Sequence, residues 1–580
     1  MTRHIPWILT ALVGAVSLAV VAVSRGETVN ALWIVVASVS CFLVAYRYYA
    51  LFIAREVMRL DPARPTPAVR RADGLDYVAT DRTVLFGHHF AAIAGAGPLV
   101  GPVLAAQMGY LPGTLWIIAG VVLAGAVQDF MVLFISMRRD GKSLGELIRM
   151  EMGQVAGTIA LFGAFMIMVI ILAVLALIVV KALAESPWGM FTVAATVPLA
   201  MAMGAYTRWI RPGRIGEVSI LGLIGLLAAI VYGQAIAESP VWGPTFTFTP
   251  VQLCWILIGY GAMLMEAFVA IMALVGASIL DPGIYFTMNS PAAVIGTDPA
   301  SVSAAVTAMG FPISPDVIVQ TAKDVGEHTI ISRAGGAPTL AVAMAEIFSH
   351  VFGGPAMKAF WYHFAILFEA LFILTAVDAG TRAGRFMLQD LIALAVPSFK
   401  DSKSQLPGFI ATGLCVAAWG FFLYQGVTDP LGGVNTLWPV FGISNQMLAA
   451  IALMLGTAVL FRMKRDRFAW VTMVPAAWLL ICTLSAGFLK LFSTDAKVGF
   501  LAHAAKYSAA LDKGEVLAPA KSMAEMRQIL FNDYVDAGLV AIFLAVVLAL
   551  LVFTIRTCLA ARGFAAPTAR EIPAQLVPTP

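Results

Sequence analysis

Long apolar runs, each about the length of a membrane-crossing helix, recur along almost the whole chain. Runs such as 157–180 and 437–461 contain no charged residue. A helix needs about 20 mostly apolar residues to cross the hydrocarbon core of a bilayer. Of the 580 residues, 60% are hydrophobic and only 12% are charged, against roughly 45–50% and 25% in soluble domains. The sequence therefore predicts an all-α polytopic integral membrane protein whose apolar surface faces the lipid bilayer.

A count of such runs gives about 14 transmembrane helices. The first run lacks the basic start and small-residue end of a cleavable signal peptide, so we interpret it as a retained helix. The expected crossings are 5–24, 31–53, 88–109, 113–137, 157–180, 190–206, 216–237, 251–279, 337–353, 357–379, 408–425, 437–461, 470–492 and 536–559.

The distribution of basic residues orients these crossings. Cytoplasmic loops carry an excess of Lys and Arg, and strict alternation with a cytoplasmic N-terminus puts 27 of the 37 Lys and Arg residues inside. Both termini are therefore expected in the cytoplasm, with the protein in the cell inner (plasma) membrane. The weakest crossing is 337–353, which is short and carries Glu346 and His350. We keep it as a crossing, because its loss would move the basic segment 462–467 outside.

The crossings divide the chain into regions. Basic residues are scattered between apolar runs rather than gathered in one domain, which excludes a nucleic-acid-binding module. The expected regions are 1–87, with two helices and a cytoplasmic loop; 88–461, a transport core with a cytoplasmic insertion of short helices at 281–336; 462–560, two helices with an extracytoplasmic loop at 493–535; and 561–580, a disordered tail rich in Pro and Ala.

The crossing 88–109 is unusually rich in glycine and proline. Proline removes a helical N–H and clashes with the preceding turn, and unpaired backbone is tolerated at membrane depth only inside protein or beside a watery cavity. The pattern predicts an unwound helix whose free N–H groups bind a substrate carboxylate; the alternative is a kinked helix that packs closely. The substrate-binding candidates here are Gly95, Ala96, Gly97, Pro98 and Gly101.

A second irregular crossing is 251–279. Its 29 residues would extend roughly 43 Å at about 1.5 Å per residue, well beyond the ~30 Å hydrocarbon core. The segment must tilt or break, and Gly259-Tyr260-Gly261 is the natural breaking point, which makes Tyr260 a further substrate-binding candidate. Paired interrupted helices in two halves indicate an inverted-repeat transporter with a midplane site.

Three carboxylates lie inside expected crossings. Ionisable residues at membrane depth are costly and are usually functional. Asp129, Glu266 and Glu369 are therefore candidates for the proton-coupling site, the alternative being structural carboxylates paired with another helix. Asp378 and Arg382 are four residues apart and should form a structural pair on one helix face. His363 lies on another face from Glu369 and is expected to be a satisfied buried histidine.

Other polar residues suggest contacts rather than metal binding. Adjacent residues of a helix point about 100° apart, so His88 and His89 cannot easily chelate one ion. Together with Gln128, they are candidates for gating or polar contact. The five cysteines lie in apolar runs without a CxxC motif. We therefore expect no metal site, no cofactor and no disulfide framework, and the absence of a Walker A motif argues against ATP-driven pumping.

Several motifs closely resemble the carbon starvation protein A family. They are FGHHFAAIAGAGPLVGPVLAAQMGYLPGTLW (86–116), AGAVQDFMVLFISMRRDGKSLGELI (124–148), GYGAMLMEAFVAIMAL (259–274), DPGIYFTMN (281–289), FEALFILTAVDAGTRAGRFMLQD (368–390) and LWPVFGISNQMLAA (437–450). The resemblance covers most of residues 30–460. It implies a secondary transporter that takes up small peptides or pyruvate during carbon starvation, coupled to protons or, alternatively, to sodium.

The resemblance also implies a five-plus-five inverted-repeat core like that of amino acid-polyamine-organocation transporters. Longer members of the family carry additional helices before the block GYGAMLMEAF, whereas here residues 255–258 run directly into Gly259. Two other classes of function stay open from the sequence. A membrane-embedded enzyme would need a polar chamber closed to one side, and a nutrient sensor would bind ligand without transporting it.

Overall fold

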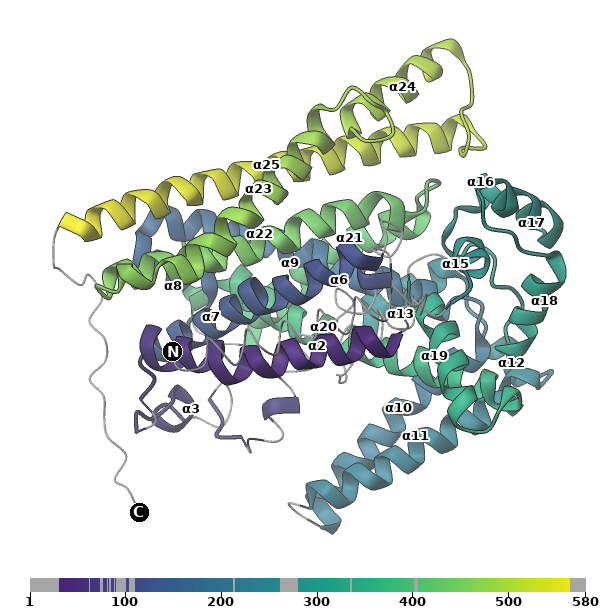
Figure 1. Ribbon diagram of the computed structural model, residues 1–580, viewed down its shortest axis with the longest axis horizontal. Helices are drawn as coiled ribbons and strands as arrows, with labels where there is room; N and C mark the ends of the chain where they lie inside the picture. Colours follow the sequence, from purple (N-terminus) through teal and green to yellow (C-terminus); the bar gives the residue numbers. More distant parts are fainter. Residues whose placement is uncertain are drawn as a thin grey trace, which may run out of the picture.

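The structure is a computed structural model of the chain. It describes residues 31–61, 63–72, 77–80, 82, 85–87, 89, 101–103, 110–211, 214–260, 280–333, 336–400 and 405–563. Every regular element in these residues is helical, and long helices pack side by side along one direction (Figure 1). The predicted all-α fold is therefore confirmed for the described part of the chain.

The described residues form helices of very different lengths. In chain order they are α2 (Ala31–Val44), α3 (Pro67–Arg70), α6 (Tyr110–Gly120), α7 (Ala126–Arg138), α8 (Leu144–Met152), α9 (Gln154–Leu183), α10 (Pro187–Ala205), α11 (Ile215–Glu238), α12 (Trp242–Thr245), α13 (Pro250–Tyr260), α15 (Pro282–Asn289), α16 (Ala292–Ile295), α17 (Pro299–Ala308), α18 (Pro315–Asp324), α19 (Ala337–Val351), α20 (Lys358–Ile392), α21 (Gln405–Thr428), α22 (Gly433–Arg462), α23 (Trp470–Phe492), α24 (Phe500–Lys513) and α25 (Met523–Gly563).

Ten described segments are long and apolar enough to cross a membrane. Each corresponds to one of the predicted crossings. They are Ile34–Val57, Gly113–Arg138, Gln154–Leu183, Pro187–Ala205, Gly216–Glu238, Pro355–Ile392, Leu406–Thr428, Thr436–Arg462, Trp470–Phe492 and Met523–Arg562. The crossing 5–24 and most of 88–109 lie outside the described residues, as does 261–279 within the crossing 251–279.

Helix α9 is the centre of the bundle. It is apolar on all sides, which is typical of a helix surrounded by protein, and from Ala173 to Val180 every side chain is buried. Helices α20, α21, α22 and α25 pack around it. Gly380 of α20 lies directly against Leu172 of α9, so a side chain at position 380 would overlap it. Small residues let the two backbones approach closely, as in other membrane helix pairs.

One end of the bundle, which we call the basic end, is held together by arginine and lysine contacts. Glu151 of α8 forms ion pairs with Arg139 at 2.8 Å and with Arg462 at 3.4 Å. The side chain of Lys464 donates to the Ala561 carbonyl at 2.6 Å, and Arg465 donates to the Val57 carbonyl at 3.0 Å. The loops predicted to share the cytoplasmic side therefore meet at this end.

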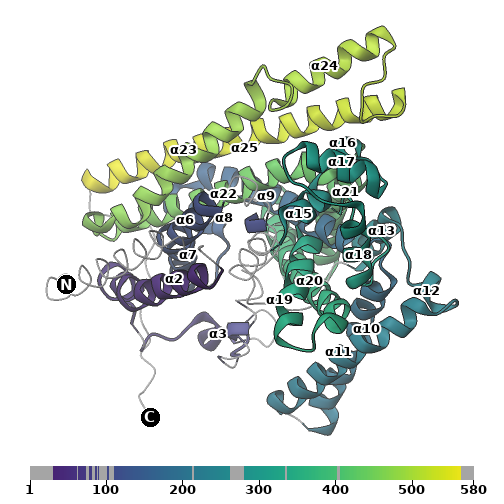
Figure 2. The same cartoon turned by 45° about the vertical axis from the view of Figure 1, so that its right-hand side comes forward.

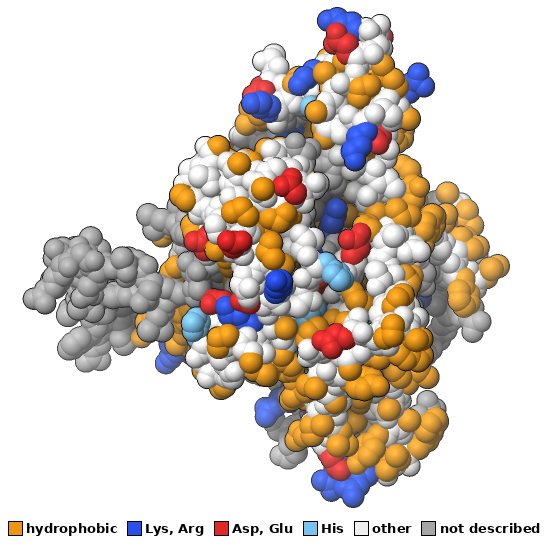
Figure 3. All heavy atoms as spheres, turned by 90° about the vertical axis from the view of Figure 1, so that its right-hand side faces the viewer, with side chains coloured by type: hydrophobic (Ala, Val, Ile, Leu, Met, Phe, Trp, Pro, Cys, Tyr) orange, Lys and Arg blue, Asp and Glu red, His pale blue; other side chains and the backbone are white. Residues whose placement is uncertain are grey.

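At the opposite end, which we call the α24 end, lie both α24 and residues 281–333 (Figures 1 and 2). Pro291 and Val294 line the same cavity as Lys490, Phe500 and His503. Viewed from this end, acidic and basic side chains are spread across the surface, as expected for a face in water (Figure 3). Residues 281–333 were expected opposite the loop 493–535, and the structure places them at the same end.

The physical reason lies in two segments predicted to cross. Helix α13 begins at the α24 end, where the Glu185 amide donates to the Phe248 carbonyl at 3.1 Å, and it is described only as far as Tyr260. Helix α19 has 15 residues, roughly 22 Å at about 1.5 Å per residue, which is short of the ~30 Å hydrocarbon core. The predicted alternation needs both segments to cross, and each segment that does not cross reverses the side of all later segments.

Candidate functional site

The predicted substrate-binding segment is only partly described. Gly95, Ala96, Gly97 and Pro98 lie outside the described residues. Gly101 is half-buried, with nothing within 4 Å of where a side chain would begin, and the backbone of Tyr260 ends α13. The predicted break in 88–109 therefore stays a prediction.

Three of the predicted polar residues come together at the start of α7. The side-chain amide of Gln128 donates to a carboxylate oxygen of Asp129 at 2.8 Å, and His89 is near enough for its charge to act on Asp129. The turn before them, Val121–Gly125, is a π-helix, an irregularity that is frequent at functional sites. Glu266 and His88 lie outside the described residues.

The same π-helical turn borders a cavity of about 650 Å³. Its lining is mostly apolar and includes Trp116, Trp470 and Trp478, together with the polar residues Asn445 and Gln446. Asn445 and Gln446 belong to the motif at 437–450 that carries the family resemblance. Sequence reasoning gave them no role, because two amides in an apolar run do not reveal that they face a cavity.

Glu369 lies deep in the bundle. It is on α20, where only 1% of its surface is exposed. Both of its carboxylate oxygens lack a hydrogen-bond partner among the described residues. Burying an unpaired charge is costly, so such a group is kept in a membrane protein for a reason other than stability.

His363 lies six residues before Glu369 on the same helix. Its ring is fully buried and stacks on Trp188 of α10, with 4.0 Å between the ring centroids. Within the described residues neither ring nitrogen has a hydrogen-bond partner. The expectation of a satisfied histidine is therefore wrong for the described part of the chain. Helix α20 thus carries two buried polar side chains, His363 and Glu369, that have no hydrogen-bond partner there.

A buried ion pair lies near His363, close enough for the charge of Arg333 to act on the His363 ring. Arg333 and Glu327 are 2.8 Å apart, with side chains only 12% and 4% exposed. Ser186 donates to the second carboxylate oxygen of Glu327 at 3.0 Å, and Arg333 donates to the carbonyls of Ala182 and Ala184 at 3.4 Å. The pair thus caps the C-terminal end of α9, where free carbonyl groups favour a cation.

The charge of Arg333 is secured by its neighbours. Burial opposes the charged form, but Tyr362 and the Glu327 carboxylate outweigh it and raise the pKa of Arg333. Sequence reasoning had placed Glu327 and Arg333 only within the insertion of short helices at 281–336. Nothing in that pattern indicated burial, because charged residues between short helices usually lie in water.

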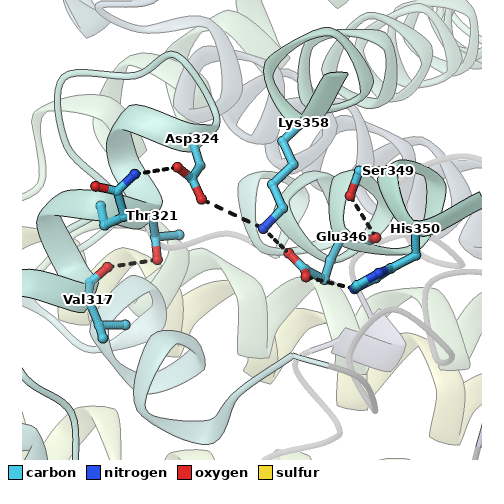
Figure 4. A network of polar contacts seen from close by, with 8 residues as sticks. Val317, Thr321, Asp324, Glu346, Ser349, His350 and Lys358 are labelled. Carbon is cyan, nitrogen blue, oxygen red and sulfur yellow. Dashed lines mark hydrogen bonds and ion pairs between the residues drawn. The ribbon is translucent and has the colours of Figure 1, made fainter. Parts of the chain in front are cut away.

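A second ionic network connects α18, α19 and α20 (Figure 4). The Lys358 ammonium is 2.8 Å from Glu346 and 3.6 Å from Asp324, and His350 is 3.1 Å from Glu346. Glu346 and His350, the two ionisable residues of the segment 337–353, therefore pair with each other. Because the His350 side chain is 76% exposed, this network holds three helices together at the surface of the α24 end.

The predicted pair of Asp378 and Arg382 is also confirmed, with 3.1 Å between the charged groups. It does not end its helix, since α20 continues to Ile392. Among the described residues, no group of three or more His, Cys, Asp and Glu side chains is arranged to hold a metal ion.

Ten described helices that can cross a membrane, with ionisable groups buried between them, are typical of a polytopic membrane protein of the transporter class. Comparison with known proteins gives the family. The sequence profile described as "Carbon starvation protein CstA" matches residues 30–260 and 256–486. The chain belongs to this family, as its motifs predicted.

The relatives are similar over nearly their whole length. The chain is 53% identical to the "Peptide transporter CstA" of Escherichia coli strain K12, covering 99% of this chain and 97% of the relative. It is 51% identical to the "Pyruvate/proton symporter BtsT" of the same strain, covering 100% and 98%. The "Peptide transporter CstA" of Campylobacter jejuni is 45% identical over 85% and 84%. No solved structure matches the chain.

These alignments are longer than the chain. The first spans 684 positions, 104 more than the 580 residues here, so the relative contains residues with no counterpart in this chain. The two profile matches meet at residues 256–260, within α13. This agrees with the expectation that longer members carry additional helices before Gly259.

Proposed function

We propose that the chain is a secondary transporter that imports small peptides, pyruvate or both across the inner membrane with protons. The proposal rests on sequence identity: about half of the residues, over the full chain, are identical to those of relatives named for these substrates. The comparisons give no support to an enzyme or to a sensor without transport.

Glu369 is the proposed proton carrier. It is buried on α20, and neither of its carboxylate oxygens has a hydrogen-bond partner among the described residues, so it is free to bind a proton and release it during the transport cycle. Asp129 is the second candidate, because it interrupts a membrane-spanning segment and lies beside Gln128 and near His89. Glu266 remains a third candidate.

The substrate carboxylate is proposed to bind the backbone at Gly95–Gly97, where the sequence predicts an unwound helix, with Pro98, Gly101 and Tyr260 as further members of the proposed site. Both peptides and pyruvate carry a carboxylate, and free N–H groups at a helix break suit an anion. The small residues there let the substrate approach the backbone directly.

Uptake into proteoliposomes tests the function. With an imposed pH gradient, alkaline inside, labelled dialanine or pyruvate should accumulate, and a protonophore should abolish accumulation. A sodium gradient alone should give none. If the protein binds these compounds but transports neither, it is a sensor, and the transport proposal fails.

We also propose a topology for the insertion. If neither 251–279 nor 337–353 crosses, residues 281–336 become extracytoplasmic while every segment from α20 onward keeps its predicted side. This moves only Lys323 and Arg333 to the outside, so the basic end stays cytoplasmic under the positive-inside rule. The five-plus-five inverted repeat needs a crossing at 251–279 to begin its second set of five helices. Because the proposed topology has no crossing there, it does not include that repeat.

Single cysteines test this topology, with native cysteines removed. Asp316→Cys on α18 and Lys513→Cys on α24 should both react with an impermeant thiol reagent added to intact cells, because both positions are exposed at the α24 end. Arg467→Cys, exposed at the basic end, should react only after permeabilisation. If Asp316→Cys does not react with the reagent in intact cells, the insertion lies in the cytoplasm and the proposed topology is wrong.

A further inference from the structure

A second cavity lies at the α24 end, and none of its lining residues belongs to the proposed substrate-binding segment. It has a volume of about 350 Å³, within the range of roughly 300–1,000 Å³ typical of small-molecule sites. Its lining brings together α16, the start of α22, the end of α23, α24 and α25. The ionisable residues that line it are Lys490, Lys497, His503 and Asp533.

One carboxylate lines this cavity, and a second is hydrogen-bonded to residues of its lining. Asp533 is 3% exposed and lies 2.6 Å from the His503 ring nitrogen. Asp429 accepts hydrogen bonds from Leu431 at 2.9 Å and Thr436 at 2.7 Å, and both of those residues line the cavity. Burial raises the pKa of Asp429, and the nearby Asp533 carboxylate adds to the rise.

A third carboxylate, Asp536, follows one turn after Asp533 on α25. It is 1% exposed, and among the described residues neither of its oxygens has a hydrogen-bond partner. Its charge interacts with those of Asp429, Asp533 and Lys490. The three carboxylates thus form one electrostatic group.

Lysine side chains lie close to these carboxylates. Lys490 interacts with Asp536 and lies over the Phe500 ring at 5.2 Å, and Lys181 interacts with Asp429. The lining itself holds Lys490 and the exposed Lys497 on one hand and Asp533 with its partner His503 on the other. The cavity therefore offers a carboxylate that an ammonium group can approach and ammonium groups that a carboxylate can approach.

We propose that this cavity is an extracytoplasmic binding site for a zwitterion with a free amino group, the ammonium contacting Asp533 and the carboxylate contacting Lys490 and Lys497. It rests on the proposed function and narrows it, since short peptides have both groups and pyruvate has no amine. A monocarboxylate would satisfy only the lysines, and an inorganic cation only the aspartates. Charge-assisted contacts at both ends favour the zwitterion.

The test is ligand protection of an introduced thiol. Val498→Cys, on the cavity wall, is made after replacing the five native cysteines and is reconstituted in proteoliposomes. Dialanine should slow its reaction with an impermeant thiol reagent, whereas N-acetyl-dialanine, pyruvate and sodium chloride should not. Lys513→Cys, at the far end of α24 and outside the cavity, should react at the same rate in every case.

Variants of the charged residues complete the test. Asp533→Asn and Lys490→Met should each raise the dialanine concentration needed for protection roughly tenfold or more, as expected for the loss of a charge-assisted contact. Asp512→Asn, on the exposed part of α24, should leave it unchanged. Absence of protection by dialanine overturns the proposal, as does equal protection by N-acetyl-dialanine, pyruvate or sodium.

Uptake measured in the same vesicles separates this proposal from the proposed function. Proton-driven uptake without protection of the thiol would overturn the cavity as a binding site and leave transport intact. Protection of the thiol without uptake of any substrate would overturn the proposed transport function and leave the cavity as a binding site.

Discussion

Glu369→Gln is expected to abolish accumulation driven by a pH gradient while exchange of labelled for unlabelled substrate continues. Glutamine keeps the size of the side chain but cannot gain and lose a proton, so the transport cycle would lose its coupling. The measurement compares pH-driven uptake with counterflow in proteoliposomes. The internal level of substrate should rise no higher than the external level.

The matched control is Asp378→Asn on the same helix. Asp378 has a partner in Arg382, whose side chain is 68% exposed, so its loss should leave coupling unchanged. If Glu369→Gln still accumulates substrate against its gradient, Glu369 is not the carrier, and Asp129→Asn becomes the decisive variant.

Arg333→Met is expected to lower the free energy of unfolding by about 3–5 kcal/mol, the usual cost of removing one partner of a buried ion pair. The change would leave the Glu327 carboxylate buried without its cation and leave the carbonyls at the end of α9 without a donor. Unfolding in mixed micelles, followed by circular dichroism, measures the loss.

Two further variants identify the cause of this loss. Arg382→Met removes the cation of the exposed pair and should cost no more than about 1 kcal/mol. The double variant Glu327→Gln/Arg333→Met should be more stable than Arg333→Met alone, because no charge is left unpaired. If the double variant is the less stable of the two, the uncompensated charge is not the source of the loss.

The long crossings could be predicted from sequence because length and apolarity alone define them. The run 157–180 is apolar on every side, and it became the buried centre of the bundle as α9. The side on which 281–333 lies could not be predicted in this way. It contains only two basic residues, so the charge rule has little to act on, and the alternation depended on crossings that the structure does not describe as complete.

The polar sites were partly predictable. Asp129, Gln128 and Glu369 stand out because each interrupts an apolar run. The pair of Glu327 and Arg333 does not, since it lies in a polar stretch and owes its burial to contacts with Ser186 and the end of α9. The carboxylates Asp429, Asp533 and Asp536 are about 100 residues apart in two groups, and only the packing of α25 against the start of α22 brings them together.

Helix α25 joins the two ends of the protein in one piece. Its 41 residues extend roughly 60 Å at about 1.5 Å per residue, about twice the hydrocarbon thickness. Asp533 lies near its first turns, and the Ala561 carbonyl that binds Lys464 lies near its last. A continuous helix cannot shorten, so a change in the width of the cavity at the α24 end would tilt or bend α25. Because the other end of α25 is bonded to Lys464, such a tilt would strain that contact at the basic end.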